Sequence, residues 1–181
     1  MGVISTPLPA KLIVGILAGR DELLSAAAER LTRDYGPIDI TSEVVPFEFT
    51  DYYVHEMGPH LRRQFVAMEP LIPPEAIKDI KLATNAMEAE FAAADPAGPP
   101  RPVNLDPGYV TESKLVLAST KDYAHRIYLG EGIYAEVTLT YARGRWIAHE
   151  HTFPDYASGT YHAFLDLARQ RLRQQLRRKE R

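Results

Sequence analysis

Apolar and polar residues show two kinds of pattern along the first hundred residues, one typical of strands and one typical of helices. Residues 11–18 are apolar apart from Lys11 and Gly15, as in a strand that is buried on both faces. Helical spacing follows between Asp21, a predicted N-cap, and Gly36, a typical glycine stop. The predicted elements are, in order, a strand at 11–18, a helix at 21–35, strands at 43–49 and 64–68, a helix opened by Pro73 and striped as far as Phe91, and a strand at 103–105.

This βαββαβ order is the ferredoxin-like arrangement, and a second β unit follows it. Apolar residues alternate with polar ones from 133 to 141, and glycine-containing turns on either side predict hairpins with 126–129 and 145–148. An apolar stripe from Tyr161 to Leu176 predicts a long helix at the C-terminus. We therefore predict a single α+β domain over residues 1–181, with a ferredoxin-like βαββαβ core extended by an antiparallel β-meander and a long C-terminal helix.

Composition agrees with one ordinary folded domain. The 181 residues are 45% hydrophobic and 25% charged with a net charge of −3, which indicates neither disorder nor a membrane protein. The longest apolar stretch, Leu12 to Ala18, is too short to span a bilayer, and the N-terminus lacks the features of a secretory signal. The absence of cysteine excludes disulfides and thiolate metal ligands. We expect a cytoplasmic protein without membrane contact, and the sequence leaves its oligomeric state open.

The densest polar chemistry falls between Asn104 and Arg126 and suggests a site for a small anionic ligand. Thr111 is a suitable N-cap and few β-branched residues follow it, so a helix is favoured over a strand there. On that helix Lys114, Lys121 and His125 would share one face, unless it ends near Lys121. Ordinary exposed lysines are the competing interpretation. The predicted ligand contacts are Lys114, Lys121, Arg126, Tyr109 and Thr111.

Three acids from separate parts of the chain are candidates for metal binding or base catalysis. Asp106 precedes Pro107-Gly108, a corner that would fix its side chain at a strand end, although aspartate before proline is also an ordinary turn former. Asp51 stands near His55 after another strand, in a lid, a metal site or a surface loop. Glu136 lies on the polar face of its strand, where water is the commoner neighbour. The predicted catalytic residues are Asp51, Asp106 and His125, and the predicted ligands of a divalent metal such as magnesium are Asp51, Asp106 and Glu136.

Two further features carry weaker signals. His149 and His151 have the spacing of two metal ligands, but no third ligand is evident near them. The segment from Arg169 to Arg181 holds seven basic residues and one acid, which a nucleic-acid partner could use. A solvated helix end is the favoured interpretation, because no aromatic residues interleave these cations as single-strand binding would require. Nucleic acid is therefore the less favoured partner.

Five segments match a known group of proteins in their amino-acid sequence: residues 9–17, 47–53, 104–111, 119–129 and 132–139. They resemble an uncharacterised prokaryotic family, the domain-of-unknown-function family forty-four-sixteen, and the resemblance runs to about Tyr156. It implies little about function. Some members carry an automatic label of GTP-binding protein, which hints at a nucleotide or another phosphorylated ligand. This chain has neither a Walker phosphate loop nor an Asn-Lys-x-Asp base-reading motif.

Three functions remain as hypotheses. The first is a protein that binds a small anionic ligand, such as a nucleotide or phosphorylated metabolite, with or without a divalent metal. The second is a non-catalytic module that contacts RNA or a protein. The third is a metal-dependent phosphoryl or nucleotidyl transferase or a hydrolase, which requires at least two carboxylates to converge. The sequence leaves open whether the protein is an enzyme.

Overall fold

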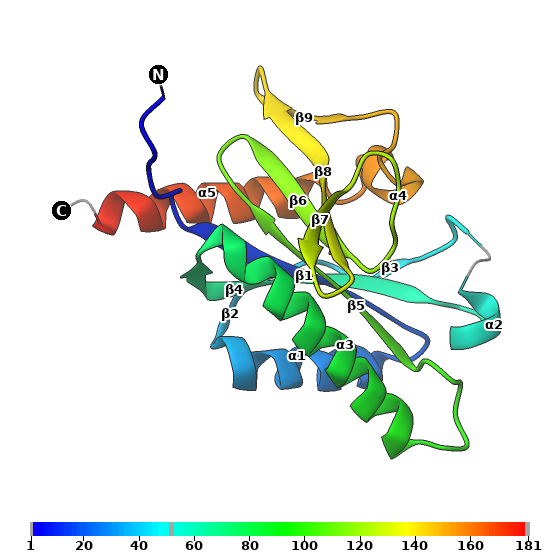
Figure 1. Ribbon diagram of the computed structural model, residues 1–181. Coiled ribbons are helices and arrows are strands. Elements are labelled where there is room, and N and C mark those ends of the chain that lie inside the picture. The colour runs from blue at the N-terminus through cyan, green and yellow to red at the C-terminus, as the bar shows by residue number, and fades with distance from the viewer. Residues whose placement is uncertain (1, 51–52, 180–181) are drawn as a thin grey trace.

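A computed structural model describes residues 2–50 and 53–179, and within them nine strands form one antiparallel sheet (Figure 1). The strands are β1 (Ala10–Ala18), β2 (Ile38–Thr41), β3 (Val45–Pro46), β4 (Arg62–Ile72), β5 (Val103–Val110), β6 (Lys114–Ser119), β7 (Ile127–Gly130), β8 (Ile133–Ala142) and β9 (Arg145–Ala148). The helices are α1 (Asp21–Tyr35), α2 (Val54–Met57), the 3₁₀ turn η1 (Pro74–Ala76), α3 (Ile77–Ala94), α4 (Pro154–Ala157) and α5 (His162–Lys179). The strand order is β2-β4-β1-β5-β6-β8-β7, with β3 paired to β4 and β9 paired to β8.

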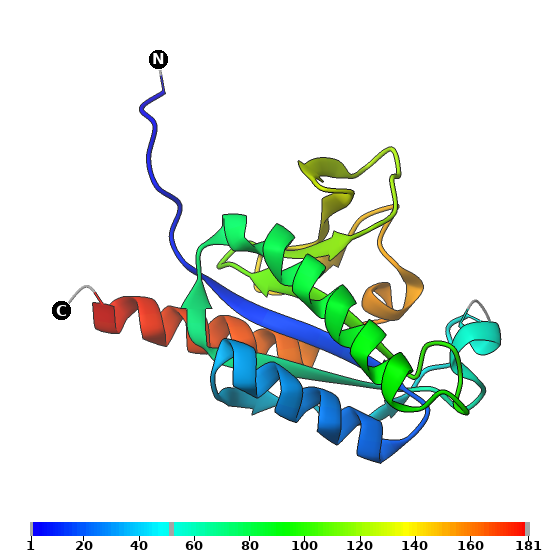
Figure 2. The ribbon, with the colours of Figure 1, turned by 60° about the horizontal axis from the view of Figure 1, so that its bottom comes forward.

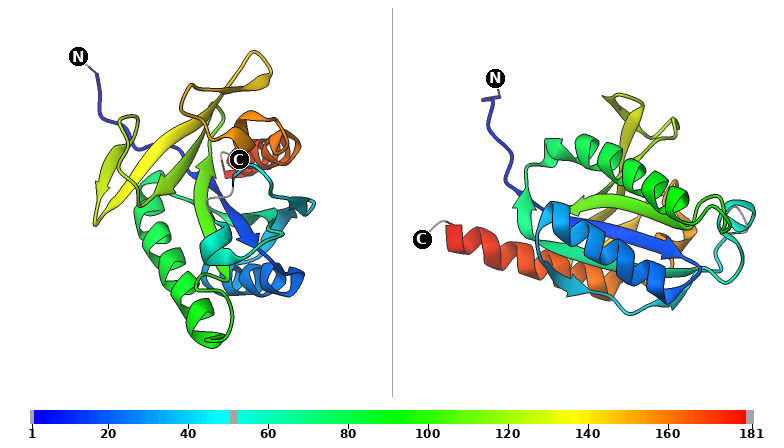
Figure 3. Two further views of the ribbon diagram at one scale, coloured as in Figure 1. Left: turned by 90° about the vertical axis from the view of Figure 1, so that its right-hand side faces the viewer. Right: turned by 90° about the horizontal axis from the view of Figure 1, so that it is seen from below.

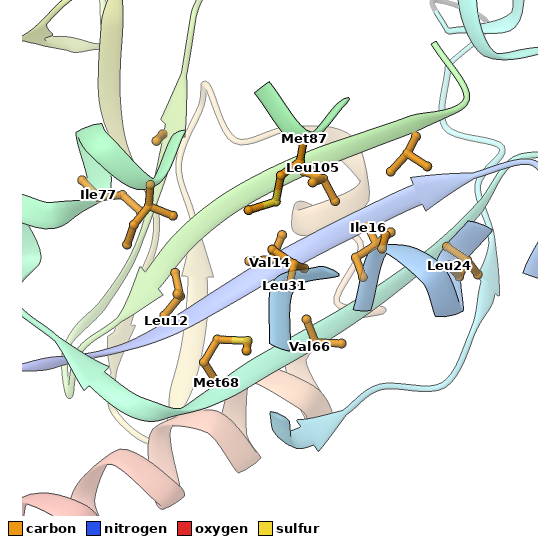
Figure 4. Packing of buried hydrophobic residues seen from close by; sticks show 14 of the residues in the cluster. Leu12, Val14, Ile16, Leu24, Leu31, Val66, Met68, Ile77, Met87 and Leu105 are labelled. Atoms are coloured by element: carbon orange, nitrogen blue, oxygen red, sulfur yellow. The ribbon is translucent and has the colours of Figure 1, made fainter. Parts of the chain in front are cut away.

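Helices cover both faces of the sheet, so the central strand β1 is buried throughout. Helices α1 and α3 lie across one face, and α5 crosses the other (Figures 2 and 3). Because side chains alternate along a strand, Leu12, Val14 and Ile16 pack toward α1 and α3, as Figure 4 shows beside Leu31 and Met87. The uninterrupted apolar run in the sequence is the result of this double cover.

Most predicted elements are confirmed, including the β-meander and the C-terminal helix. The predicted strand at 43–49 is reduced to the two residues of β3, and β2 was not predicted at all. Asp21 is the first residue of α1 and not its N-cap, which is Arg20. The Asp21 carboxylate instead accepts a hydrogen bond from Arg62 at 2.7 Å, so a contact with β4 replaces the capping interaction.

The helix predicted after Thr111 is wrong, because this segment is strand β6. Its four central residues, 115–118, are buried and lie between β5 and β8, so no polar face marks the strand in the sequence. Thr111 closes the β5–β6 hairpin, since its Oγ1 accepts a hydrogen bond from the Lys114 backbone N–H at 3.2 Å. The shared helical face of Lys114, Lys121 and His125 does not exist. Lys114 begins the six-residue strand and Lys121 follows its end, roughly 20 Å away.

Helix α5 uses its basic residues partly for contacts within the protein. The guanidinium of Arg169 lies 3.8 Å from the centre of the Tyr141 ring and donates to the backbone carbonyl of Glu112 at 2.7 Å. Arg171 lies 3.6 Å from a carboxylate oxygen of Asp39. These contacts fasten the helix to the sheet. None of the helices in the described part of the chain combines the length and the apolar content needed to cross a bilayer.

Candidate functional site

A cavity of about 460 Å³ opens at one end of the sheet, on the side of β5, β6 and β8 where α4 lies. Its walls come from strands β4, β5, β6 and β8, from helices α3 and α4, and from four connecting segments around Phe49, Arg101, Thr120 and Phe153. This volume lies in the range of pockets that hold small organic ligands. Segments that are far apart in the sequence therefore build the site.

The cavity forms where β5 and β6 separate, and Pro107 explains the separation. Pairing between the two strands ends at Gly108 and Leu117, although β5 continues through Pro107 and Asp106. The backbone N–H and carbonyl of Leu105 point away from β1, toward the side of β5 on which β6 lies. Backbone groups two residues apart in a strand point the same way, so those of Pro107 point toward β6. Proline has no N–H to donate, and the ladder stops there. The corner predicted at Pro107-Gly108 is thus wrong, because the strand runs straight through both residues.

Side chains of α3 take the place of the missing strand partner. The backbone N–H of Leu105 donates to Glu88 Oε1 at 2.7 Å, and its carbonyl accepts from Lys81 Nζ at 2.8 Å. Arg101 donates to Glu88 Oε2 at 2.9 Å and so holds that carboxylate from the other side. The open edge of β5 is satisfied without closing the cavity.

Asp106 is the centre of the cavity floor. Its Oδ2 accepts hydrogen bonds from Arg63 Nη1 and from Asn104 Nδ2, each at 2.8 Å, and Lys81 Nζ lies 4.0 Å from its Oδ1. Arg101 also hydrogen-bonds the side-chain oxygen of Asn104. Two cationic side chains and one amide thus contact this carboxylate, and a third cation, Arg101, binds the amide.

Gly15 makes room for Arg63 to reach Asp106 from the far side of β1. A Cβ atom at position 15 would lie 2.8 Å from Arg63 Nη1 and 2.9 Å from Phe65 Cε1, both closer than real contacts allow. Strand β1 lies between β4, which carries Arg63, and β5, which carries Asp106. The guanidinium therefore crosses over the glycine. It also lies 5.1 Å from the centre of the Phe47 ring, in cation–π geometry.

Burial and charge pull the ionisable groups of the floor in different directions. Burial would raise the pKa of Asp106, but Arg63 and Lys81 outweigh it, so this pKa is lowered and the carboxylate stays charged. Burial alone would lower the pKa of Arg63, yet Asp106 raises it above its usual value. The pKa of Lys81 is lowered by burial despite Asp106. Burial raises the pKa of Asp155 on α4, where Arg63 only partly offsets it.

Glu136 is the centre of a second polar group, on the β8 wall. Its Oε2 accepts from Arg126 Nε at 2.8 Å and lies 3.0 Å from His125 Nε2, while its Oε1 accepts from Thr138 at 3.0 Å. Arg126 also donates to Ser119 Oγ at 2.7 Å and to the Lys121 backbone carbonyl at 2.8 Å. Arg126 therefore fixes the start of the loop that carries Lys121. The sequence favoured water as the neighbour of Glu136, but its side chain is almost completely buried.

Four rings form a row beside this second group. His125 stacks on His151 at 4.1 Å between ring centres, and His149 stacks on His151 at 5.5 Å. Tyr123 stacks on the other side of His125 at 5.9 Å. Within the described residues, no three histidine or carboxylate side chains are placed to hold a metal ion. The histidine spacing noted in the sequence therefore corresponds to ring stacking.

The structure brings together part of the predicted site. Asp106, Glu136, Lys121 and Arg126 all line the cavity, and His125 lies next to it through its contact with Glu136. Lys114, Tyr109 and Thr111 do not line it. Thr111 and Lys114 sit at the hairpin end of β5 and β6, and Tyr109 packs against the α1–α3 core. Asp51 lies outside the described residues.

Sequence reasoning missed several residues of the site. These are Arg63, Lys81, Arg101, Asp155 and Tyr156, which all line the cavity. Lys81 gave a signal in the sequence, because it follows Ile80 beside the apolar stripe of α3. In the structure its side chain is buried. Arg63 gave a weaker one, as a charged residue at the start of a strand that becomes apolar. Buried cations inside apolar patterns are rare enough to mark a site.

Comparison with known proteins adds a family. The model of the family described as "Domain of unknown function (DUF4416)" matches residues 8–172, nearly the whole chain. The resemblance stated from the sequence is confirmed and extends past Tyr156. No curated protein and no solved structure matches the chain.

Proposed function

Because the chain belongs to this family of unknown function, we propose from the site geometry alone that the protein binds a small anionic ligand in the cavity. The cavity lies in the range of small-molecule pockets, and it combines apolar and aromatic walls with a limited set of polar groups.

The observation that carries this proposal is the charge of the cavity wall. Among the described lining residues, five are cationic and three are acidic: Arg63, Lys81, Arg101, Lys121 and Arg126 against Asp106, Glu136 and Asp155. The whole protein has the opposite sign, with a net charge of −3. A positive concavity in a negative protein attracts anions selectively, and low-dielectric walls focus its field. Burial raises the pKa of Asp155, and Arg63 only partly offsets this.

The same contacts weaken the metal-dependent alternative. Asp106 Oδ2 and Glu136 Oε2 each accept from an arginine, and Glu136 Oε1 accepts from Thr138. A divalent cation would compete with these bonds and with the surrounding positive charge. The contacts therefore favour binding of an anion over a magnesium-dependent transferase or hydrolase.

The RNA-binding alternative also loses support, because arginines of the C-terminal helix contact the protein itself. The ferredoxin-like description remains our inference for half of the sheet. The strand order β2-β4-β1-β5, with α1 and α3 as the two crossover helices, supports it.

Thermal-shift measurements followed by isothermal titration calorimetry test the binding proposal. The probes are nucleoside mono-, di- and triphosphates, sugar phosphates and inorganic phosphate, each with and without magnesium. We expect at least one phosphorylated probe to raise the melting temperature, because a ligand of the native state stabilises it. Lys121→Ala should weaken that probe about tenfold, the order of a lost charge-assisted hydrogen bond.

Lys114→Ala is the matched control, since it removes the same charge from the opposite end of β6. Its affinity should stay within about twofold of the wild type, given that isolated surface charges contribute little. Absence of stabilisation by every probe, or equal losses in both lysine variants, would contradict the proposal.

A further inference from the structure

Two hydrogen-bonding groups at the cavity have no partner within the described residues. The Tyr156 hydroxyl and the Arg63 Nε–H are both buried, and both residues line the cavity. Most buried polar groups in native proteins are hydrogen-bonded, because leaving one unpaired destabilises the fold. Three other buried atoms without a partner, Asp39 Oδ1, His149 Nε2 and His162 Nε2, belong to residues that do not line the cavity, whereas these two can both donate to a molecule bound there.

Both groups are held rigidly by their surroundings. The Tyr156 ring packs edge-on against Phe65, with ring centres 5.8 Å apart, and against Tyr161, at 5.3 Å. The Arg63 guanidinium is fixed by Asp106 and by the Phe47 ring. Only the hydroxyl hydrogen of Tyr156 is free to rotate, about the bond between the ring and the oxygen. A ligand would therefore meet donors that are already in place, which lowers the entropic cost of binding.

The missing partner must be an acceptor, because the N–H of an arginine can only donate. Lys81 Nζ lies 4.0 Å from the carboxylate that Arg63 binds, and Arg101 hydrogen-bonds Asn104 next to that carboxylate; both cations line the cavity and are donors only. These four residues come from four separate parts of the fold: β4, α3, the segment before β5, and α4. A planar carboxylate offers two oxygens in one plane, whereas a tetrahedral oxyanion offers three or four oxygens in different directions. Donors that approach from several sides suit the tetrahedral group.

We propose that this end of the cavity binds a phosphoryl group of a small molecule, with the Tyr156 hydroxyl and Arg63 Nε as two of its donors. This inference rests on the proposed function and narrows it to one chemical class and one subsite. Asp106 and Asp155 are the acids nearest to the subsite. Asp106 is neutralised by Arg63 and Lys81, and Asp155 accepts a hydrogen bond from the Tyr161 hydroxyl at 3.3 Å.

The Tyr156→Phe variant tests the subsite, because it removes only the unpartnered hydroxyl. Without ligand, we expect its melting temperature to equal or exceed that of the wild type, since an unpaired buried group is lost. Its affinity for inorganic phosphate, and for the phosphorylated probe that binds best, should fall about tenfold. A ligand contact predicts this combination of retained stability and weakened binding, and a structural role of the hydroxyl does not.

Tyr109→Phe is the matched control. Tyr109 packs against the α1–α3 core and is not among the residues that line the cavity, so removing its hydroxyl should keep the phosphate affinity within about twofold of the wild type. Sulfate and acetate separate the geometries. Sulfate should compete with phosphate, and acetate should bind much more weakly.

The outcomes separate this inference from the proposed function. If Tyr156→Phe binds phosphate like the wild type while Lys121→Ala does not, anion binding stands and the Tyr156 subsite is refuted, with a buried water as the partner of the hydroxyl. Acetate binding as tight as that of phosphate would refute the tetrahedral geometry. If no phosphorylated probe and no phosphate binds at all, both proposals fail.

Discussion

Lys11 and Arg63 are buried cations on neighbouring strands, and each pairs with an aspartate, yet their surroundings differ. Lys11 Nζ contacts Asp39 at 2.7 Å, the Glu69 carbonyl at 3.4 Å and the side chain of Gln175 on α5 at 3.1 Å. All three of its N–H groups thus have a partner from the protein. Arg63 pairs with Asp106 at 2.8 Å, but its Nε has none, and its aspartate faces the cavity.

The two pairs lie about 20 Å apart along β1, judged from the register of Lys11 with Leu71 and of Leu17 with Arg63. Burial is nearly the same, with Lys11 at 0% and Arg63 at 3% exposure. Burial of charge therefore does not distinguish a structural ion pair from one that serves a ligand. The atoms left without a partner do: Asp39 Oδ1 beside Lys11 can only accept a hydrogen bond, whereas Arg63 Nε can only donate one. Lys11 joins helix α5 to the sheet, whereas Arg63 retains hydrogen-bonding capacity for another molecule.

Lys11→Ala should give the largest effect of the comparison. Removing one member of a buried pair leaves the other uncompensated, and the free energy of unfolding should fall by about 3–5 kcal/mol. Urea denaturation measures this loss. Binding of the phosphorylated probe, measured where the variant is folded, should be unchanged because Lys11 does not line the cavity. A loss below about 1 kcal/mol, or weakened binding, would remove the distinction between the pairs.

Gly15→Ala should give an intermediate effect and tests whether the open pair depends on the crossing over β1. The new methyl group would overlap Arg63 Nη1 and Phe65, and relieving the overlap should cost about 1–3 kcal/mol. Anion affinity should fall as well, because Arg63 must move. Gly19→Ala is the control: its Cβ would have no neighbour closer than 3.7 Å, so stability and binding should stay near wild type. Similar results for both glycines would show that the crossing does not matter.

The free energy of unfolding should also depend on pH differently for the two pairs, and this effect should be smaller than that of either substitution. The folded-state pKa of Asp106 is lowered, so its contribution is complete at neutral pH and is lost as pH falls below about 4. The stability difference between the wild type and Asp106→Asn should therefore narrow in acid. Burial lowers the pKa of Lys11 in the folded protein. The unfolded chain therefore binds the proton more tightly, and the free energy of unfolding should rise as the pH approaches 10.5, the usual pKa of a lysine. Denaturation at several pH values measures both trends, and a difference for Asp106→Asn that widens in acid would contradict them.

Local patterns were sufficient for much of the fold. The run at 11–18 and the stripe from Ile77 to Phe91 predicted β1 and α3, because each pattern records which side of the element is buried. Strand β6 was missed because both of its faces are covered by parts of the chain that are distant in sequence. Strand β6 is buried because of the elements that pack around it, and a short apolar run in the sequence does not show which elements these are.

The site was harder to predict for the same reason. Asp106 and Glu136 share a cavity only because β6 lies between β5 and β8, and this order is not local. Arg63 approaches Asp106 across a third strand, over a glycine whose role depends on the packed sheet. Individual residue types suggested an anion site between Asn104 and Arg126. They could not indicate that three of its five cationic side chains come from β4, α3 and the loop before β5.

The opening between β5 and β6 originates in one imino acid. Pro107 interrupts the ladder through a missing hydrogen atom in its backbone. Glu88 and Lys81 of α3 then satisfy the backbone of Leu105 on the same edge, so one proline and two side chains keep the hollow open. Substitution of the remaining lining residues should change which molecules fit the hollow and leave the hollow itself in place.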